Sequence, residues 1–299
     1  MMRYQGEIVD PHQHFWEPAD GNQPWLCPEG AIDFRYGDYS AIKRRYLPDD
    51  YARDAEHWNV VATIYIETEW REDDPLGELA WVESLATRCG RPNAMIAHAR
   101  LNRPDADAVL ARHSASKLVR GIRHKPGGAR VPGTTGRTLM SDEGWRRGYS
   151  LLERHGFHFE LQVAWWHLDE AAALARDFPN TRIILNHTGL PSDRSDEALA
   201  GWRRALERLS REPNTAIKIS GLGQLGITSP ASTDAWIIEQ AISTFTPDRA
   251  MFASNYPVDS LCGSFDDIYR SFSRAASSLG EEQQRKLFAN TARYIYSLP

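Results

Sequence analysis

The 299-residue sequence has few cysteines and no long apolar run. Cys27, Cys89 and Cys262 are far apart and form no C-x-x-C pair, so the pattern predicts neither a disulfide framework nor a zinc knuckle. No apolar stretch approaches the ~18 residues that a membrane helix needs, and the first residues reach a charge before any apolar run develops. We therefore expect a chain of the reducing cytoplasm that makes no membrane contact.

An excess of positive charge is also missing. The chain has 35 Lys and Arg against 40 Asp and Glu, which gives a formal net charge of −5. The short basic runs, such as 43–45, are typical of a solvated surface. Nucleic acid is therefore not expected as a partner, and a small molecule is.

Short strand-like runs alternate with amphipathic helical stretches along the whole chain. This alternation is typical of parallel βαβ units. Eight such runs are present: Glu7–Asp10, Val60–Glu67, Ala94–Leu101, Leu118–His124, His158–Val163, Arg182–Asn186, Thr215–Ser220 and Arg249–Ser254.

Eight units over this length predict an α/β fold, a closed (β/α)8 TIM barrel, as one domain spanning residues 1–299. A doubly wound open sheet would also use such units, but it usually has a glycine-rich phosphate turn after its first strand, and here that turn is Pro-His-Gln-His. The segment 15–58 lacks clear periodicity and follows the first strand, so we expect it to lie over the barrel mouth.

Histidines follow two of the predicted strands. Asp10-Pro11-His12-Gln13-His14 ends the first, and residues two apart in extended backbone share a face, so both imidazoles point the same way. Such a pair can bind one metal ion or converge on one carbonyl oxygen. His187 follows the sixth strand, at the end where barrel enzymes keep their catalytic groups.

The eighth strand is followed by Ser254-Asn255-Tyr256-Pro257-Val258-Asp259. A polar cluster directly after a buried strand, with a proline that stops the strand, is typical of a site loop. Asp259 also suits the alternative role of N-cap for the next helix.

Taken together, these three motifs resemble the amidohydrolase superfamily, and more closely its amidohydrolase-2 branch of sugar-lactone and pyrone-dicarboxylate lactonases. The resemblance covers nearly the whole chain. It includes Glu67 on the second strand, Gly121-Ile122-Arg123-His124 on the fourth, Lys218-Ile219-Ser220-Gly221-Leu222 on the seventh and the closing segment 288–296.

The sequence departs from the two-metal members of this superfamily at two strands. Those members carry a histidine on the fifth strand, where Gln162 stands here. The eighth-strand aspartate that is usual in the family as a whole is Asn255 here. Asparagine brings no negative charge for a cation and is no general base near neutral pH. A binuclear centre is therefore not expected. The reaction needs no cofactor on this interpretation, or a single divalent ion such as zinc held by His12, His14 and His187.

The resemblance implies a hydrolase that opens the ester of a sugar-acid lactone or a related carboxylated lactone with activated water. His12, His14 and His187, with Asn255 beside them, would polarise the carbonyl, and Asp259 or Glu67 would take the proton from water. The residues expected to bind substrate are Glu67, Arg123, His124, Gln162 and Trp16. An amidohydrolase-2-type decarboxylase and a catalytically impaired barrel that binds a small ligand are the alternatives.

Overall fold

A computed structural model describes residues 3–133, 136–224 and 232–299. Its eight parallel strands follow one another around a single sheet in the order β1 to β8. The strands are β1 Ile8–Gln13, β2 Val60–Ile66, β3 Ala94–His98, β4 Val119–Arg123, β5 His158–Leu161, β6 Ile183–Leu185, β7 Thr215–Ile219 and β8 Ala250–Phe252. Each of the eight predicted strands is confirmed, most of them one to three residues shorter than expected.

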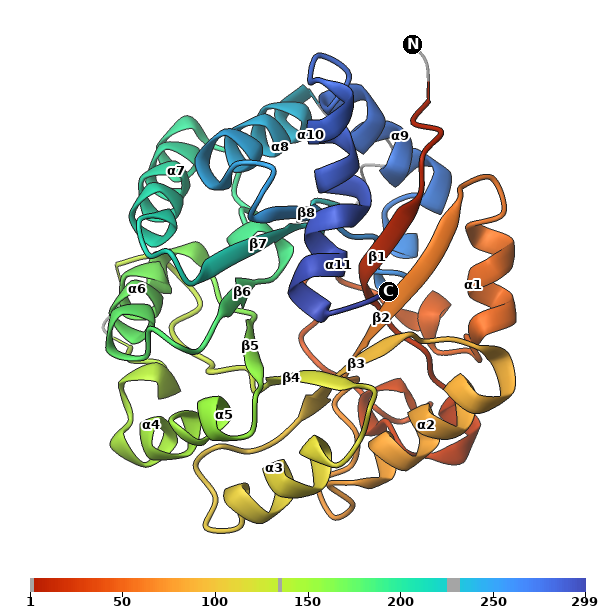
Figure 1. Cartoon of the computed structure of the whole chain (residues 1–299), viewed down its shortest axis with the longest axis vertical. Helices are drawn as coiled ribbons and strands as arrows, with labels where there is room; N and C mark the ends of the chain where they lie inside the picture. The colour runs from red at the N-terminus through yellow and green to blue at the C-terminus, as the bar shows by residue number, and fades with distance from the viewer. Residues whose placement is uncertain (1–2, 134–135, 225–231) are drawn as a thin grey trace.

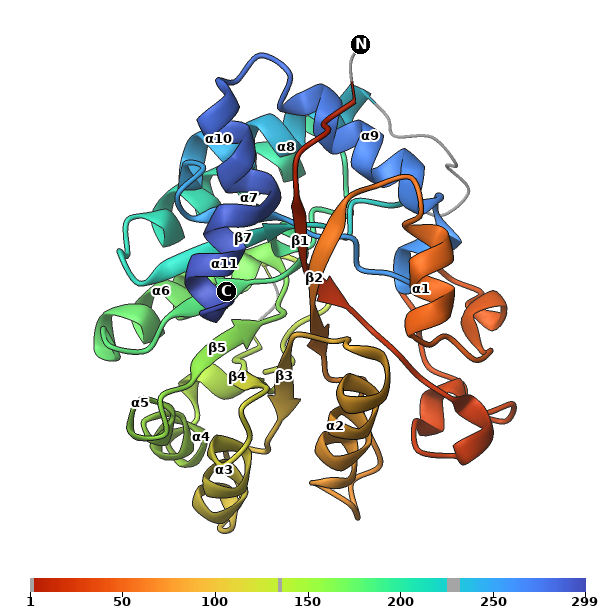
Figure 2. The ribbon, with the colours of Figure 1, turned by 45° about the vertical axis from the view of Figure 1, so that its right-hand side comes forward.

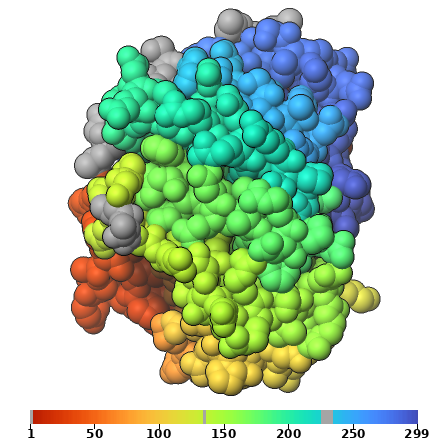
Figure 3. All heavy atoms as spheres, turned by 90° about the vertical axis from the view of Figure 1, so that its left-hand side faces the viewer, coloured from red at the N-terminus to blue at the C-terminus, as the bar shows by residue number. Residues whose placement is uncertain are grey.

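Helices surround this ring of strands (Figure 1). They are α1 Pro48–Asp54, α2 Gly77–Cys89, α3 Ala106–Ser114, α4 Glu143–Tyr149, α5 Leu151–Arg154, α6 Leu168–Asp177, α7 Asp196–Ser210, α8 Ser232–Phe245, α9 Phe265–Ala275, α10 Glu281–Arg285 and α11 Thr291–Tyr296. Figure 3 shows the face of the molecule on which α6 and α7 lie, in green and teal. The (β/α)8 barrel predicted from the sequence is confirmed. No helix of the described ranges is long and apolar enough to span a membrane.

The barrel closes where β1 meets the end of β8. The backbone N–H of His14 donates to the carbonyl of Tyr256, and that of Asn255 donates to the carbonyl of His12, both at 2.8 Å. The buried Asp10 carboxylate reinforces this seam because it accepts hydrogen bonds from the backbone and the hydroxyl of Ser254. The closure therefore places the histidines of β1 directly beside the loop after β8.

The N-terminal end of the barrel is covered by α11, which crosses the ring of strands in Figures 1 and 2. Ala289, Ala292 and Tyr296 pack there against inward-facing apolar residues of the strands, including Ile64 and Met251. The opposite, C-terminal end stays open to the loops, which is where polar side chains gather.

A buried ion pair lies inside the barrel between these two ends. Lys218 of β7 and Glu160 of β5 are fully buried, and their charged atoms are 2.8 Å apart. The carboxylate also accepts hydrogen bonds from the Tyr296 hydroxyl and the Asn186 amide. Burial lowers the pKa of Lys218 to about 8, although Glu160 opposes this shift. The lysine thus places a fixed positive charge beneath the open end of the barrel.

Replacing one member of this ion pair is expected to destabilise the fold more than replacing both members together. Lys218→Met should cost about 3–5 kcal/mol, because it leaves a carboxylate buried without its countercharge. The double variant Lys218→Met, Glu160→Gln should recover most of that loss. Urea unfolding followed by tryptophan fluorescence measures both. A double variant no more stable than the single one would contradict this account.

Candidate active site

Three histidine rings meet at the C-terminal end of the barrel. The ring centroid of His12 lies 5.1 Å from that of His14 and 4.5 Å from that of His187, and all three side chains are buried. The rings of His14 and His187 line a cavity of about 280 Å³ that we call the histidine chamber. The structure thus brings together the histidines that the sequence placed on separate strands.

The rings of His14 and His187 are each oriented by a contact of one ring nitrogen, whereas the ring of His12, which neighbours both, is not. The His14 Nδ1 lies 2.8 Å from the carbonyl oxygen of Ile66, and the His187 Nδ1 lies 3.0 Å from the hydroxyl of Ser220. Neither ring nitrogen of His12 has a hydrogen-bond partner among the residues that the structure describes, although both are buried. Buried polar atoms without partners are rare in folded proteins and mark a place where a ligand can supply the missing contact.

The three imidazoles are uncharged near neutral pH. Burial lowers the pKa of each, and it lowers that of His14 to about 3 with a further contribution from the nearby Arg123. An uncharged imidazole carries one N–H, with which it can donate to a carbonyl oxygen. The chamber floor therefore offers uncharged imidazoles rather than fixed positive charge, with an acceptor nitrogen on His14 because its Nδ1 donates to the Ile66 carbonyl.

The loops that carry His187 and Asn255 have a strained backbone. Their φ angles are 51° and 54°, in the left-handed region that residues other than glycine rarely adopt. Such conformations cost about 1–3 kcal/mol and persist where surrounding contacts enforce them, often at functional sites. Both residues line the chamber, so the left-handed backbone occurs where two of the expected site residues lie.

Arg123, Glu67 and Gln162 form one hydrogen-bonded group in the chamber wall. The Arg123 Nε donates to the Glu67 carboxylate at 2.5 Å, and its Nη1 donates to the Gln162 carbonyl oxygen at 3.2 Å. Burial would raise the pKa of Glu67, but the positive charges beside it, above all that of Arg123, outweigh this and hold it well below its ordinary value. Glu67 is therefore ionised at every pH at which the protein would work.

Asp259 lies behind Asn255 and is held by several donors. Its carboxylate accepts hydrogen bonds from the Asn255 amide at 2.6 Å, the Tyr36 hydroxyl at 2.9 Å and the backbone N–H of Gly221 at 3.1 Å, and Arg35 is 3.5 Å away. Burial raises its pKa, which Arg35 partly opposes. Asn255 borders the chamber, and Asp259 is not among the residues that line it.

The other predicted site residues divide between two cavities. Trp16 lines the histidine chamber, and its ring stacks on that of His14 with 6.1 Å between centroids. His124 instead lines a neighbouring cavity on the side of β2 to β4. It was grouped with Arg123 because the two are adjacent in the sequence, but consecutive residues at the end of a strand face opposite ways.

The charged residues of this site that the sequence interpretation missed include Arg35, Lys125 and Lys218. Arg35 comes from segment 15–58, and it lines the chamber. The expectation that this segment lies over the mouth could have drawn attention to it. Lys218 stands in the apolar strand Thr215–Ile219, where an ionisable side chain is itself a signal of a polar interior.

The histidines have the chemistry of a zinc ligand set. Imidazole nitrogens suit zinc, and the contacts of His14 and His187 through Nδ1 are of the kind that orient ligand histidines. The unpartnered nitrogens of His12 fit the same interpretation. As the side chains stand, however, no group of three or more His, Cys, Asp or Glu residues within the described ranges is arranged around one metal position. Asn255 adds no negative charge to the set.

Comparison with known proteins identifies the family. The family model described as Amidohydrolase, of the amidohydrolase-2 family, matches residues 9–298. The chain belongs to this family, as its three motifs indicated.

Among relatives, an uncharacterized protein, y4mH, from Sinorhizobium fredii is 35% identical, and the match covers 97% of this chain and 98% of that protein. An L-fucono-1,5-lactonase from Burkholderia multivorans is 29% identical over 97% of this chain and 96% of its own length. A solved amidohydrolase structure from the same organism, with bound zinc, has a TM-score of 0.81 and 26% identity and covers 98% of this chain and all of the other.

Glu78 provides a test of the charge distribution beside the site. It is buried behind Glu67 and accepts hydrogen bonds from Thr68 and Tyr65. Burial, and then the charge of Glu67, raise its pKa from 4.5 to about 7. The stability that this shift contributes is therefore complete below pH ~4.5 and is lost as the pH rises through about 7.

Glu78→Gln should gain stability relative to the native chain as the pH rises from 4.5 to 8, by about 2–3 kcal/mol. The reason is that glutamine stays neutral where the carboxyl must ionise. Urea unfolding at several pH values measures the difference. Glu83→Gln, at an exposed position of the same helix, is the control and should show no such trend. A difference that does not change with pH would refute the assignment.

Proposed function

We propose that the chain hydrolyses the ester bond of a lactone, that of a sugar acid or of a related carboxylated compound. The observation that carries the proposal is the group of three uncharged, buried imidazoles, two of which line a chamber whose wall holds an ionised carboxylate, Glu67, paired with an arginine. The lactonase among the relatives supports the choice of a lactone as substrate.

Imidazole N–H groups polarise the lactone carbonyl in this mechanism. The Nε2 of His187, whose Nδ1 can accept from the Ser220 hydroxyl, and one nitrogen of the adjoining His12 ring donate to the oxygen as it becomes an oxyanion. His14 uses its single N–H on the Ile66 carbonyl, so its Nε2 is an acceptor that can orient the attacking water. The positive charges of Lys218 and Arg123 lie close enough to these rings to lower the pKa of His12 further, and the same charges favour a developing anion. A divalent ion held by the three histidines would supply Lewis-acid polarisation of the same carbonyl.

Glu67 takes the proton from the attacking water. Of the two carboxylates predicted for this role, Asp259 is the more basic because burial raises its pKa, whereas Glu67 borders the chamber. Location decides between them, since a general base must reach the proton that it abstracts. Asp259 instead holds the Asn255 amide nitrogen, which leaves the carbonyl oxygen of Asn255 as the acceptor for water or a substrate hydroxyl.

Cations around the chamber bind the carboxylate of the substrate. Arg35 and Lys125 line it, and each is partly exposed, so a planar carboxylate can reach them from solvent. Arg123 is nearly buried and bonded to Glu67 and Gln162, so its main effect is to hold these two side chains in place.

A screen of aldonolactones, pyrone lactones and muconate lactones with a pH indicator should detect acid release above the uncatalysed rate. His187→Ala should reduce it at least about 100-fold, because it removes one donor to the oxyanion. His57→Ala, at an exposed histidine away from the chamber, is the control and should be fully active. Lactones that raise the melting temperature without turnover would overturn the hydrolase and favour a binding barrel.

The choice of base predicts unequal effects of two isosteric changes. Glu67→Gln should lower kcat by about 10²–10⁴-fold, because the proton acceptor is lost. Asp259→Asn should lower kcat less than about tenfold and raise KM, because it only loosens Asn255 and Arg35. Steady-state kinetics on one lactone substrate separate the two. The reverse order of effects would assign the base to Asp259.

A further inference from the structure

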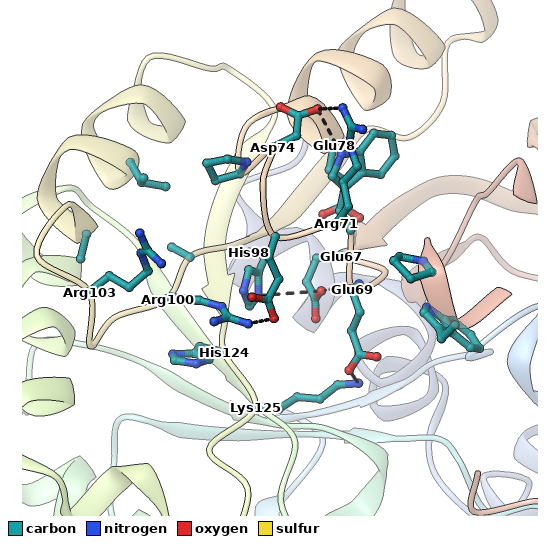
Figure 4. A pocket seen from close by; sticks show the side chains of 18 of the residues that line it. Glu67, Glu69, Arg71, Asp74, Glu78, His98, Arg100, Arg103, His124 and Lys125 are labelled. Atoms are coloured by element: carbon teal, nitrogen blue, oxygen red, sulfur yellow. Dashed lines mark hydrogen bonds and ion pairs between the residues drawn. The ribbon is translucent and has the colours of Figure 1, made fainter. Parts of the chain in front are cut away.

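A second cavity adjoins the histidine chamber and is larger than it. Its volume is about 620 Å³, and it lies between the loops that follow β2, β3 and β4 (Figure 4). The two cavities share Trp25, Ile32, Glu67, Glu69 and Lys125 in their walls. The lactone hydrolysis proposed above takes place in the smaller cavity and does not involve the second one.

The basic side chains in the described lining of this second cavity are all paired with acidic ones. Arg71 pairs with Asp74, Arg100 with Glu72, Arg103 with Asp105 and Lys125 with Glu69. Every arginine and lysine in its described lining therefore has an acidic partner, and Figure 4 shows several of these pairs at its edge. An anionic ligand would have to break such a pair to reach a positive charge, so a neutral ligand is favoured over an anionic one.

Two histidines of this cavity offer fixed and opposite hydrogen-bonding roles. The His124 Nδ1 accepts from the backbone N–H of Leu101 and from the indole of Trp145, so the ring carries its hydrogen on Nε2 and donates there. The His98 Nδ1 lies 3.1 Å from the carbonyl oxygen of Arg123 and must donate to it, which leaves Nε2 as an acceptor in the neutral ring.

These two rings are neighbours, with centroids 5.7 Å apart and their planes nearly perpendicular. A donor and an acceptor side by side match a pair of adjacent hydroxyl groups, one of which accepts while the other donates. Trp25 and Trp70 add aromatic faces to the same cavity, which suit the apolar face of a sugar ring.

From these observations we infer that the second cavity is a subsite for a neutral, hydroxylated ring, so that the preferred substrate carries a glycosyl unit beyond its lactone. This inference rests on the proposed lactone hydrolysis for the reaction itself. The lactone lies in the histidine chamber, and the glycosyl unit extends past Glu69 and Lys125 to His98 and His124.

Kinetics on a matched pair of lactones test the subsite. The kcat/KM for cellobiono-1,5-lactone should exceed that for glucono-1,5-lactone at least tenfold. Val109→Phe, which fills the cavity from α3, should lower this ratio at least tenfold, mainly through the KM of the larger lactone. Ala111→Phe, on the exposed face of the same helix, should leave the ratio unchanged. Turnover of both lactones with a ratio near one, unaffected by Val109→Phe, would overturn the subsite and leave the hydrolase standing.

Calorimetry with the neutral disaccharide alditol cellobiitol tests the subsite without turnover. Saturable binding that Val109→Phe weakens at least tenfold, and Ala111→Phe does not, supports it even if neither lactone is hydrolysed. In that case only the proposed lactone hydrolysis is refuted, and the subsite stands. If the native chain does not bind cellobiitol and shows no preference for the larger lactone, the subsite is refuted.

Discussion

The seam between β1 and β8 is the constraint on which the site depends, and Asp10 holds it. Its carboxylate accepts hydrogen bonds from Ser254 twice, from the Tyr51 hydroxyl at 2.7 Å and from the backbone N–H of His12. One buried group thereby fixes the last strand, the first strand and helix α1 at a single point. His12 lies two residues further along β1 and Asn255 one residue beyond Ser254, so the seam sets their separation.

The charge distribution around the site follows from burial. The imidazoles of His12, His14 and His187 stay neutral because the surrounding barrel excludes water. Lys218 and Arg123 are each held in an ion pair, Lys218 with Glu160 and Arg123 with Glu67. Uncharged imidazoles thus meet at a chamber with Arg123 in its wall and Lys218 beneath it, and these two positive charges favour an anion forming at the histidines.

Much of the fold could be predicted because its signals are local. A strand such as Ile183–Leu185 is an apolar run with a polar cluster after it, and that pattern is visible in the sequence alone. The ends of the strands also placed His187 and Asn255 at the mouth. The partners of Asp259 could not be predicted, because Tyr36 is 223 positions away and belongs to a segment without periodicity.

The sequence by itself determined the alternation of strands and helices, the number of barrel units and which polar residues end the strands, because these depend on neighbours along the chain. Only the tertiary structure decided that Arg123 is tied to Glu67, that Asp259 is turned toward Tyr36 and Asn255, and that His124 faces a second cavity. Those outcomes depend on side chains brought together from different loops, and the closure of the barrel alone sets which of them meet.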